Sequence, residues 1–314
     1  MTQLANDNPV VVSRSVSGGV LLAVVSATSF GLSGPLATGM LATGWKPGAI
    51  VLARMGLAAL GLAPFTLASL RGRWGLLRGQ LTQLLVYGVL AVAGAQFCYF
   101  SAVATMDVAP ALLIEYTAPA AVVGWLWLRR GQRPRLLTVA GAVLAAAGLV
   151  LVLNLFSGAH LAWAGVAWAL AAMVGATSYF LISADTGTGL PPLSLAGIGL
   201  TIGAVVLALL GIVGVLPMHA TSTPVSFALG SVPWWLPLLL LGLVTAGLAY
   251  VTGIAASRLL GSRVASFVAL LEVVAAVGFA WLLVSQLPGV SQLAGGLLII
   301  AGVIAVKLGD RAQP

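Results

Sequence analysis

Long apolar runs, separated by short polar connections, cover almost the whole chain. Ten runs reach about 20 residues, the length that an α-helix needs to cross roughly 30 Å of bilayer hydrocarbon. The pattern therefore predicts an all-α integral membrane protein with ten transmembrane helices. The predicted spans are residues 18–40, 48–70, 81–104, 109–128, 136–156, 162–184, 193–216, 234–256, 264–285 and 289–308.

The composition agrees with a membrane protein. Apolar residues make up 61% of the chain and charged residues only 6%, whereas soluble domains carry roughly 25% charged residues. The first 17 residues are polar and lack the basic, apolar and small-residue regions that mark a signal peptide in that order. We therefore expect residues 1–17 to form a short flexible cytoplasmic tail.

The 14 Lys and Arg residues are unevenly distributed over the connections. If the N-terminus is cytoplasmic, only Lys46 lies outside and Arg54 lies within a span, so this bias predicts that both termini are cytoplasmic. The net charge of +8 therefore sets topology. The cations form no stripe, and we expect no nucleic-acid partner. The cytoplasmic set is Arg14, Arg71, Arg73, Arg78, Arg129, Arg130, Arg133, Arg135, Arg258, Arg263, Lys307 and Arg311.

An internal similarity divides the chain into two halves. Residues 140–149 read AGAVLAAAGL, and 154 positions later residues 294–303 read AGGLLIIAGV. Each copy closes a block of five predicted spans, and an odd number of crossings forces the second block to lie inverted relative to the first. We therefore predict two inverted five-helix repeats, residues 18–156 and 162–308. Many secondary transporters have this architecture, with the substrate site near the midplane between the halves.

Stripes of small residues on the fifth, seventh and tenth predicted spans indicate close helix packing. Lipid gives two apolar helices no hydrophobic reason to associate, so helix contacts in membranes rest on small residues. We interpret these stripes as packing faces that leave the polar residues of other spans to line a cavity. The stripes contain Gly141, Ala145 and Gly148, then Gly199 and Gly203, and finally Gly295 and Gly302.

Three ionisable residues lie at membrane depth: Arg54, Glu115 and Glu272. Each costs at least ~2.5 kcal/mol to place there, so each is a candidate functional residue. At about 1.5 Å of rise per residue, all three lie roughly 10–13 Å from a span end and can face one cavity.

Several interpretations of these groups remain open. Arg54 either snorkels to the surface along its own stem, forms a structural ion pair with Glu115, or binds a substrate carboxylate bidentately. Glu272 is either a protonated, hydrogen-bonded structural carboxyl or the carboxyl of a proton-coupled carrier. The same choice applies to Glu115.

Other polar and aromatic groups lie within the spans. Gln96 and Tyr99 share a helix face because they are three residues apart. Pro35 predicts a bent or broken helix in the first span, and Pro119 in the fourth span frees a backbone carbonyl one turn back. The full set of candidate substrate-binding or coupling residues is Arg54, Glu115, Glu272, Gln96, Tyr99, Tyr116, Tyr179 and Tyr250.

Motifs of other protein classes are absent. The chain has no GxxxxGK[ST] phosphate-binding loop, no HExxH and no GxSxG. The lone Cys98 lies within a span and offers no metal-ligand spacing. We therefore expect no catalytic residue, no metal and no cofactor, and an intramembrane enzyme is disfavoured.

The order of several short motifs resembles the EamA-type members of the drug/metabolite transporter superfamily, over residues 18–308. These motifs are Ser29-Phe30-Gly31, Leu52-Ala53-Arg54, Glu115-Tyr116-Thr117-Ala118-Pro119, Leu270-Leu271-Glu272 and the Ala-Gly phrases of the fifth and tenth spans. The family commonly has Pro after this Glu, whereas this chain has Val273. The sequence therefore leaves in doubt whether the ninth span has a proline-dependent kink. At the 154 offset Ala118, rather than Glu115, lies opposite Glu272, so the two carboxyls need not be symmetric partners.

The resemblance implies a multi-pass secondary carrier of the cytoplasmic membrane that works by alternating access. Members often export small molecules such as amino acids, other metabolites or drugs. A cavity with one Arg and one or two Glu suits a zwitterion or an amphipathic compound, and protons are a candidate coupling ion. Two alternatives stay open: an uptake carrier for a sugar, nucleotide-sugar or other metabolite, and a non-transporting membrane subunit. Direction and oligomeric state do not follow from the sequence.

Overall fold

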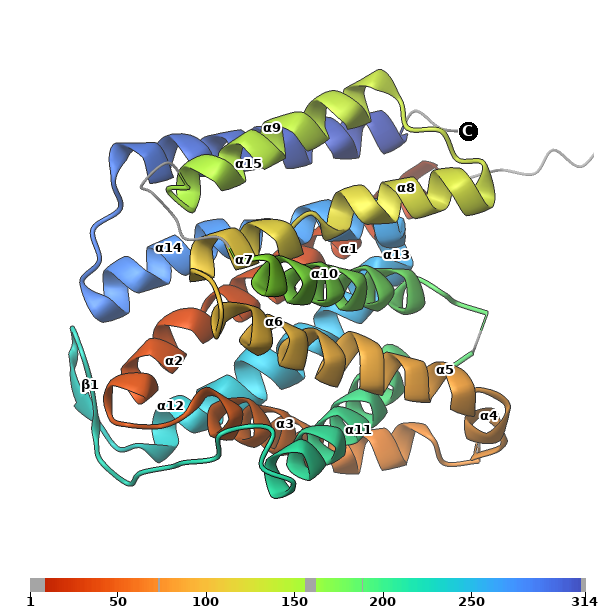
Figure 1. The fold of residues 1–314 in the computed structure, drawn as a ribbon. Coiled ribbons are helices and arrows are strands. Elements are labelled where there is room, and N and C mark those ends of the chain that lie inside the picture. Colours follow the sequence, from red (N-terminus) through yellow and green to blue (C-terminus); the bar gives the residue numbers. More distant parts are fainter. Residues whose placement is uncertain (1–8, 73, 156–161, 188, 312–314) are drawn as a thin grey trace, which may run out of the picture.

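The long helices lie roughly alongside one another, with the end of α15 at one end of the bundle and a small hairpin at the other (Figure 1). This computed structural model describes residues 9–72, 74–155, 162–187 and 189–311. The end that carries Arg258, Arg263 and Asp310 is called the basic end below. The end that carries the hairpin is called the hairpin end.

The helices and strands follow the two halves of the chain. The first half forms α1 (Pro9–Gly31), α2 (Ser33–Ala42), α3 (Pro47–Ser69), α4 (Trp74–Gly79), α5 (Leu81–Val86), η1 (Tyr87–Gly94), α6 (Ala95–Val103), α7 (Val108–Glu115), α8 (Ala118–Arg130) and α9 (Leu136–Val152). The second half forms α10 (Trp163–Ser183), α11 (Pro192–Ile212), β1 (Val225–Phe227), β2 (Gly230–Val232), α12 (Trp235–Leu239), η2 (Leu240–Leu248), α13 (Ala249–Ala269), α14 (Leu271–Val284) and α15 (Val290–Arg311).

Eight helical segments among the described residues are long and apolar enough to cross a membrane. Two further apolar helices are shorter: α9 has 17 residues and α14 has 14. The predicted count of ten crossings is therefore not confirmed by helix length. Residue 156, where the fifth predicted span ends, lies outside the described residues.

The predicted connection between spans 234–256 and 264–285 is reduced to a turn at Gly261. Residues Trp235–Ala269 form one segment of 35 residues, interrupted only at Gly261, whose φ of 76° and ψ of 160° are not helical. Glycine takes a positive φ without steric cost, so the chain turns within one residue and needs no polar loop. Hydrophobic periodicity cannot show so short a turn. Residues 264–269 therefore belong to α13, and α14 begins only at Leu271.

Two polar regions also differ from prediction. The first eight residues of the predicted flexible tail, residues 1–17, lie outside the described residues, whereas α1 already begins at Pro9. Proline suits the first position of a helix because its φ is preset and its missing N–H would have no partner there. In the predicted loop before the eighth span, β1 and β2 form an antiparallel hairpin that pairs Val225 with Val232.

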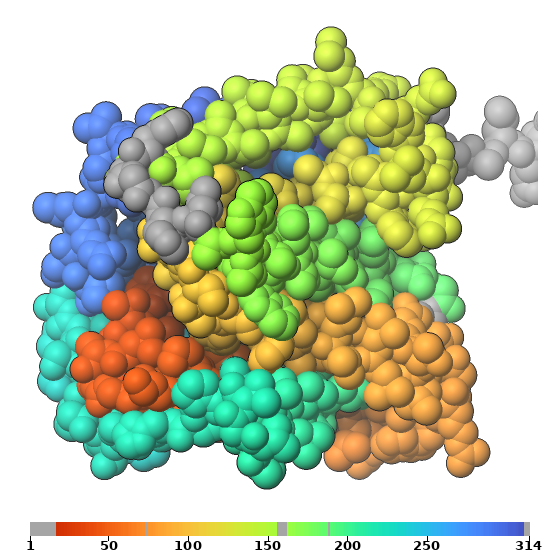
Figure 2. Space-filling view, viewed as in Figure 1, coloured from red at the N-terminus to blue at the C-terminus, as the bar shows by residue number. Residues whose placement is uncertain are grey.

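The two halves interlock. Helix α1 of the first half packs against α13 and α14 of the second, while α10 of the second half packs against α6, α7 and α8 of the first. In the same reciprocal way, α3 contacts η2 and α11 contacts η1. Figure 2 shows α10, in green, lying between α8 and the orange α5–α6 segment. Most contacts that hold the bundle together therefore join one half to the other.

Irregular backbone occurs at equivalent places in both halves. The π-helix η1 covers residues 87–94, and a shift of 154 places it at residues 241–248, within the π-helix η2. The break between α7 and α8 at Tyr116 shifts to Leu270, where α13 ends. Because π-helical turns are rare and frequently lie at functional sites, their repetition indicates that the halves share a backbone plan.

Helices α9 and α15 form a separate layer at the top of Figure 1, which we call the α9–α15 seam. Gly141 lies against the carbonyl of Gly302, and Gly148 lies against the carbonyl of Gly295. The contact register shows that the helices are antiparallel. At the 154 offset Gly141 corresponds to Gly295 and Gly148 to Gly302, so each glycine meets the counterpart of the other. Such an isologous contact implies a local two-fold axis between the helices.

Candidate functional site

A cavity of about 580 Å³ lies between the two halves. Its lining reaches the hairpin end at Leu41 and Val108, whose side chains are 43% and 52% exposed. No described residue of α9, α11 or α15 lines it, which agrees with the interpretation of their small residues as packing faces. All eight residues predicted from the sequence line this one cavity: Arg54, Gln96, Tyr99, Glu115, Tyr116, Tyr179, Tyr250 and Glu272.

Arg54 projects from α3 and is buried, with 7% exposure. Its Nη2 donates a hydrogen bond to the carbonyl oxygen of Thr245 in η2, at 2.7 Å. The guanidinium carbon lies over the ring of Phe30, 5.7 Å from its centroid, within the range of a cation–π contact. The Nε atom is buried and has no hydrogen-bond partner among the described residues.

These contacts decide between the interpretations of Arg54. Snorkelling is wrong, because the guanidinium lies inside the bundle. The ion pair with Glu115 is also absent among the described residues, where Arg54 lies within 4 Å of no carboxylate oxygen. Anion binding stays a prediction, and the buried unpaired Nε–H is compatible with it because such donors normally have partners.

The two carboxyl groups lie at helix breaks. Glu115 is the last residue of α7, immediately before the break at Tyr116 and Thr117. Glu272 lies in the first turn of α14, just after the end of α13. Tyr116 Oη donates a hydrogen bond to Glu272 Oε1 at 3.3 Å, which joins the two breaks. The partial positive charge of the α14 N-terminus favours a carboxylate at Glu272, whereas the α7 C-terminus disfavours one at Glu115.

The break before Glu272 does not depend on a proline. Val273 occupies the position where the family commonly has Pro, yet α13 and α14 are separated at Leu270, whose φ of −61° and ψ of −17° stay in the α-helical region. Val273 N–H donates to Leu270 O at 3.1 Å, which is a tighter turn than the regular α-helical bond. The interruption at Leu270 therefore forms without a proline.

Two glycines let α1 and α13 approach the site closely. A Cβ atom on Gly31 would lie only 2.7 Å from the carbonyl oxygen of Glu272. Gly253 in α13 leaves room for the hydroxyl groups of Tyr179 and Ser26. Larger residues at either position would push apart the helices that carry the candidate residues.

A row of aromatic rings leads from Arg54 toward the basic end. Phe30 contacts Tyr250 edge-on with centroids 5.3 Å apart, and Tyr250 contacts Tyr179 in the same way at 5.5 Å. Tyr87 then stacks on Tyr179 at 6.1 Å. Tyr87 is fully buried and does not line the cavity. Tyr87 therefore lies behind Tyr179, outside the lining of the cavity.

Sequence reasoning missed several cavity residues, above all serines. Ser26, Ser257 and Ser266 all line the cavity. A serine within an apolar helix commonly bonds the carbonyl one turn back, as Ser257 does with Gly253 at 2.8 Å, so serine alone is a weak signal. The spacing of Ser26, Phe30, Ser33 and Ala37 along one helix face contains the missing signal, because all four line the cavity.

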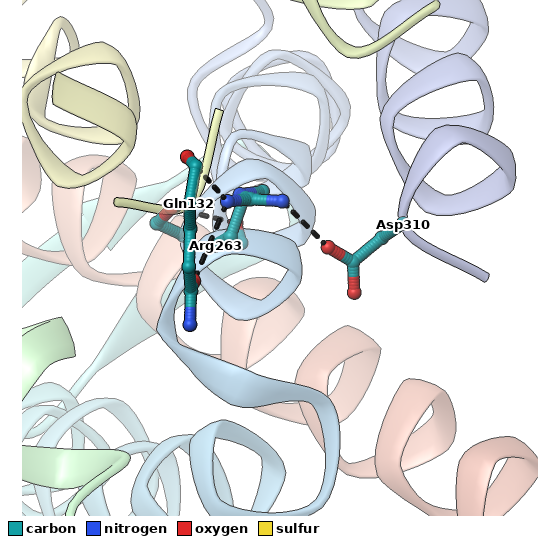
Figure 3. A network of polar contacts seen from close by, with 4 residues as sticks. Gln132, Arg263 and Asp310 are labelled. Atoms are coloured by element: carbon teal, nitrogen blue, oxygen red, sulfur yellow. Dashed lines mark hydrogen bonds and ion pairs between the residues drawn. The ribbon is translucent and has the colours of Figure 1, made fainter. Parts of the chain in front are cut away.

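The basic end is closed by a polar network (Figure 3). Arg263, only 4% exposed, forms an ion pair with Asp310 of α15 at 3.1 Å. Its Nη2 also donates to the backbone and side-chain oxygens of Gln132, at 3.4 and 3.5 Å. Arg263 therefore fastens α13, a cavity helix, to α15 and to the connection between α8 and α9.

Comparisons with known proteins place this fold. Twenty-nine solved chains match significantly. One of them, a protein of known crystal structure, shares 23% identity and superposes with a TM-score of 0.72, over 95% of this chain and 99% of that one. At this identity the likeness shows the fold alone. A search of curated proteins finds no significant match. The sequence profile of the EamA-like transporter family matches twice, over residues 17–154 and 163–308. With two copies of the family repeat covering most of its length, this chain belongs to the EamA-like transporter family of membrane transporters in the drug/metabolite transporter superfamily.

Proposed function

We propose that this transporter is a secondary carrier that exports small zwitterionic or amphipathic metabolites, amino acids among them. The observation that carries the proposal is the cavity of about 580 Å³ between the halves, which brings Arg54, Glu115 and Glu272 together. This volume is within the range of small-molecule sites. Its combination of one cation, two carboxyl groups and several rings offers a partner to each part of an amphipathic zwitterion.

Each part of such a substrate has a candidate partner. Arg54 is the candidate for a carboxylate, since its Nε–H has no hydrogen-bond partner among the described residues and charge-assisted bonds to guanidinium are strong. Glu115 is the candidate for an ammonium group. The apolar part lies against the aromatic side of the cavity, and Gln96 supplies a further donor and acceptor. The aromatic candidates are Tyr99, Tyr116, Tyr179 and Tyr250.

The proposed topology has ten crossings in two inverted repeats, residues 18–156 and 162–308. Helix α9 covers about 26 Å at the rise of an α-helix and crosses with modest bilayer adjustment. The ninth crossing combines α14 with the residues of α13 that follow Gly261. The local two-fold axis of the α9–α15 seam supports the inversion. Positively charged connections face the cytoplasm, so the protein lies in the cytoplasmic membrane with both termini inside and the cavity open to the exterior.

Alternating access follows from the reciprocal packing of the halves. In a carrier built from inverted repeats, one half rocks against the other around a fixed site. Here the basic end is closed by Arg263 and the aromatic stack, while the hairpin end is open. In the other state this arrangement reverses. We assign Glu272 the coupling role, because its carboxyl lies at the junction of both helix breaks and bonds Tyr116.

Flux measurements in proteoliposomes test this function. Labelled amino acids and cationic drugs are screened with and without a pH gradient, for the wild-type protein, Glu272→Gln and the control Asp107→Asn. Asp107 is an exposed carboxylate at the hairpin end. We expect a pH gradient to stimulate the flux of amino acids through the wild-type protein. Glu272→Gln should reduce this flux at least tenfold, whereas Asp107→Asn should change it less than twofold.

Other outcomes would contradict parts of the proposal. Gradient-independent flux that survives Glu272→Gln would leave a facilitator with a structural Glu272. Flux of sugars or nucleotide-sugars alone would favour the uptake alternative. If none of these compounds moves and a stable partner copurifies, the chain is a non-transporting subunit.

A further inference from the structure

We propose that Arg258 forms a second carboxylate-binding site, separated from Arg54 by the tyrosine stack, which holds the substrate carboxylate when the cavity opens to the basic end. This inference rests on the proposed function. It adds a binding residue that lies outside the cavity in the present conformation.

Arg258 has unused hydrogen-bonding capacity. Its Nη1 donates to the carbonyl oxygen of Leu190, in the connection between α10 and α11. Its Nε and Nη2 atoms are buried and have no hydrogen-bond partner among the described residues. Leaving a buried donor unpaired costs free energy, and for a charged group the cost is larger than for a neutral one. A ligand that arrives in another conformational state explains why such donors are retained.

Arg54 and Arg258 are held in the same way. Each guanidinium donates from one Nη atom to a single backbone carbonyl of another element, that of Thr245 for Arg54 and that of Leu190 for Arg258. Each leaves Nε buried without a hydrogen-bond partner among the described residues. One anchored edge fixes the orientation of the planar group and leaves other N–H bonds for an incoming anion.

The position of Arg258 places it just beyond the floor of the cavity. Ser257 lines the cavity and Arg258 does not. Arg258 lies eight residues after Tyr250 on α13, hence about 12 Å further toward the basic end at the rise of an α-helix. Tyr87, whose ring stacks on Tyr179, is close enough to Arg258 to interact electrostatically. The stack of Tyr250, Tyr179 and Tyr87 therefore separates the two arginines.

The three rings of this stack belong to different moving parts. Tyr87 lies in η1 of the first half, Tyr179 in α10 and Tyr250 in α13 of the second. Rocking of the halves changes the separation between Tyr87 and Tyr179 and opens the floor of the cavity toward Arg258. A substrate that enters from the basic end then meets Arg258 before it reaches Arg54.

The carboxylate near Arg258 makes its hydrogen bonds elsewhere. Asp185 is the carboxylate close enough to interact with it electrostatically, but no ion pair joins them among the described residues. Asp185 instead accepts hydrogen bonds from Gln83 Nε2 at 3.3 Å and from Gly187 N–H at 2.9 Å. With its neighbouring carboxylate occupied, Arg258 is available to a substrate carboxylate.

Transport kinetics measured from each side of the membrane test the assignment. The protein is reconstituted with known orientation, and initial rates are measured for labelled phenylalanine and for phenylalaninamide, which lacks the carboxylate. The variants are Arg258→Gln, Arg258→Lys and the control Arg71→Gln, which removes an exposed arginine at the same end. We expect Arg258→Gln to raise the KM for phenylalanine about tenfold from the basic-end side and less than twofold from the hairpin-end side. The KM for the amide stays unchanged, and Arg258→Lys restores part of the loss.

Each other result overturns a defined claim. If Arg258→Gln changes neither KM, or changes those of phenylalanine and its amide equally, or acts equally from both sides, Arg258 is not a carboxylate site. If the wild-type protein moves neither compound, the proposed amino-acid function fails and this inference fails with it. Loss of folding in Arg258→Gln is recognised by its elution profile, in which case Arg258→Lys, which keeps the charge but not the guanidinium fork, must show the sided effect.

Discussion

Along the α9–α15 seam, counterparts 154 positions apart are the same residue at both crossing points: Gly141 with Gly295, and Gly148 with Gly302. Around the cavity, counterparts occupy equivalent places but differ in chemistry. Glu115 corresponds to Ala269, Ala118 to Glu272 and Gln96 to Tyr250, and all six line the cavity.

The difference has a physical reason. In the seam each glycine packs against the counterpart of the other, so one steric requirement acts on both copies of the repeat. In the cavity, the residues face a space for a molecule that has no two-fold symmetry, and one Arg with two Glu residues cannot be distributed equally over two halves. The repeat thus builds a symmetric frame around an asymmetric site.

The largest effect is expected from breaking the seam. A Cβ on Gly148 would lie 2.5 Å from the carbonyl oxygen of Gly295, and one on its counterpart Gly302 would lie 2.6 Å from that of Gly141. We predict that Gly148→Val and Gly302→Val each destabilise the protein by about 3 kcal/mol or more and abolish recovery of monodisperse protein. Gly278→Val is the control, since nothing lies within 4 Å of the added Cβ. Unequal effects of the two seam variants would contradict the local symmetry.

The next largest effect is expected at the cavity, and it should leave the packing of the helices nearly unchanged. Arg54→Gln removes the buried guanidinium and its bond to Thr245, so we predict at least a tenfold loss of flux. Arg54→Lys keeps the charge but loses the planar fork, and recovers a small part. Thermal unfolding of the detergent-solubilised protein should shift by only a few degrees. A collapse of stability with no selective loss of flux would make Arg54 a structural residue.

A smaller effect is expected at the link between the two regions. Asp310→Asn weakens the ion pair that fastens Arg263 of the cavity helix to the seam helix α15. Asp310 is partly exposed, so we predict a destabilisation of about 1–2 kcal/mol and a several-fold change in flux, because the basic end opens more readily. Unchanged rates from both sides of the membrane would show that this pair does not limit opening. Asp107→Asn, which changes an exposed carboxylate at the hairpin end, serves as the control.

The smallest effect is expected from a single hydroxyl. Tyr116→Phe removes the donor to Glu272, whose hydrogen bond is long at 3.3 Å. A bond of this kind contributes roughly 1 kcal/mol, so we predict a two- to fivefold change in gradient-driven flux and no change in stability. Tyr99→Phe, on the same cavity wall, is the matched control. Equal effects of both variants would show that the bond to Glu272 has no special role.

Much of the arrangement of helices could be predicted because it depends on patterns that are local in sequence. Apolar runs identify the helices, the Lys and Arg bias orients the connections, and a fixed offset relates the halves. The same offset also relates the two π-helices and the helix breaks at Tyr116 and Leu270. The turn at Gly261 lies within the predicted connection, residues 257–263, but its length of one residue escaped prediction, since a single glycine does not reveal its φ.

The sequence predicted residues that line the cavity, but it did not predict the contacts that these residues make. Ionisable residues are costly in a bilayer, so Arg54, Glu115 and Glu272 stand out from the sequence alone, and all three line the same cavity. The sequence could not predict the contacts of Arg54, which bonds a backbone carbonyl and pairs with neither carboxylate. The carbonyl of Thr245 lies 191 residues away in the chain, and no pattern reports which backbone group a distant side chain will reach.

The sequence by itself determined the class of protein, its division into two related halves and the residues worth suspecting, because burial in lipid restricts which side chains each segment can carry. Only the tertiary structure decided which end of the cavity is open, which rings close the other end, and which donors of Arg54 and Arg258 remain unpaired. Those properties depend on how helices of one half pack between helices of the other, and packing at that range is set by the shape of many side chains together.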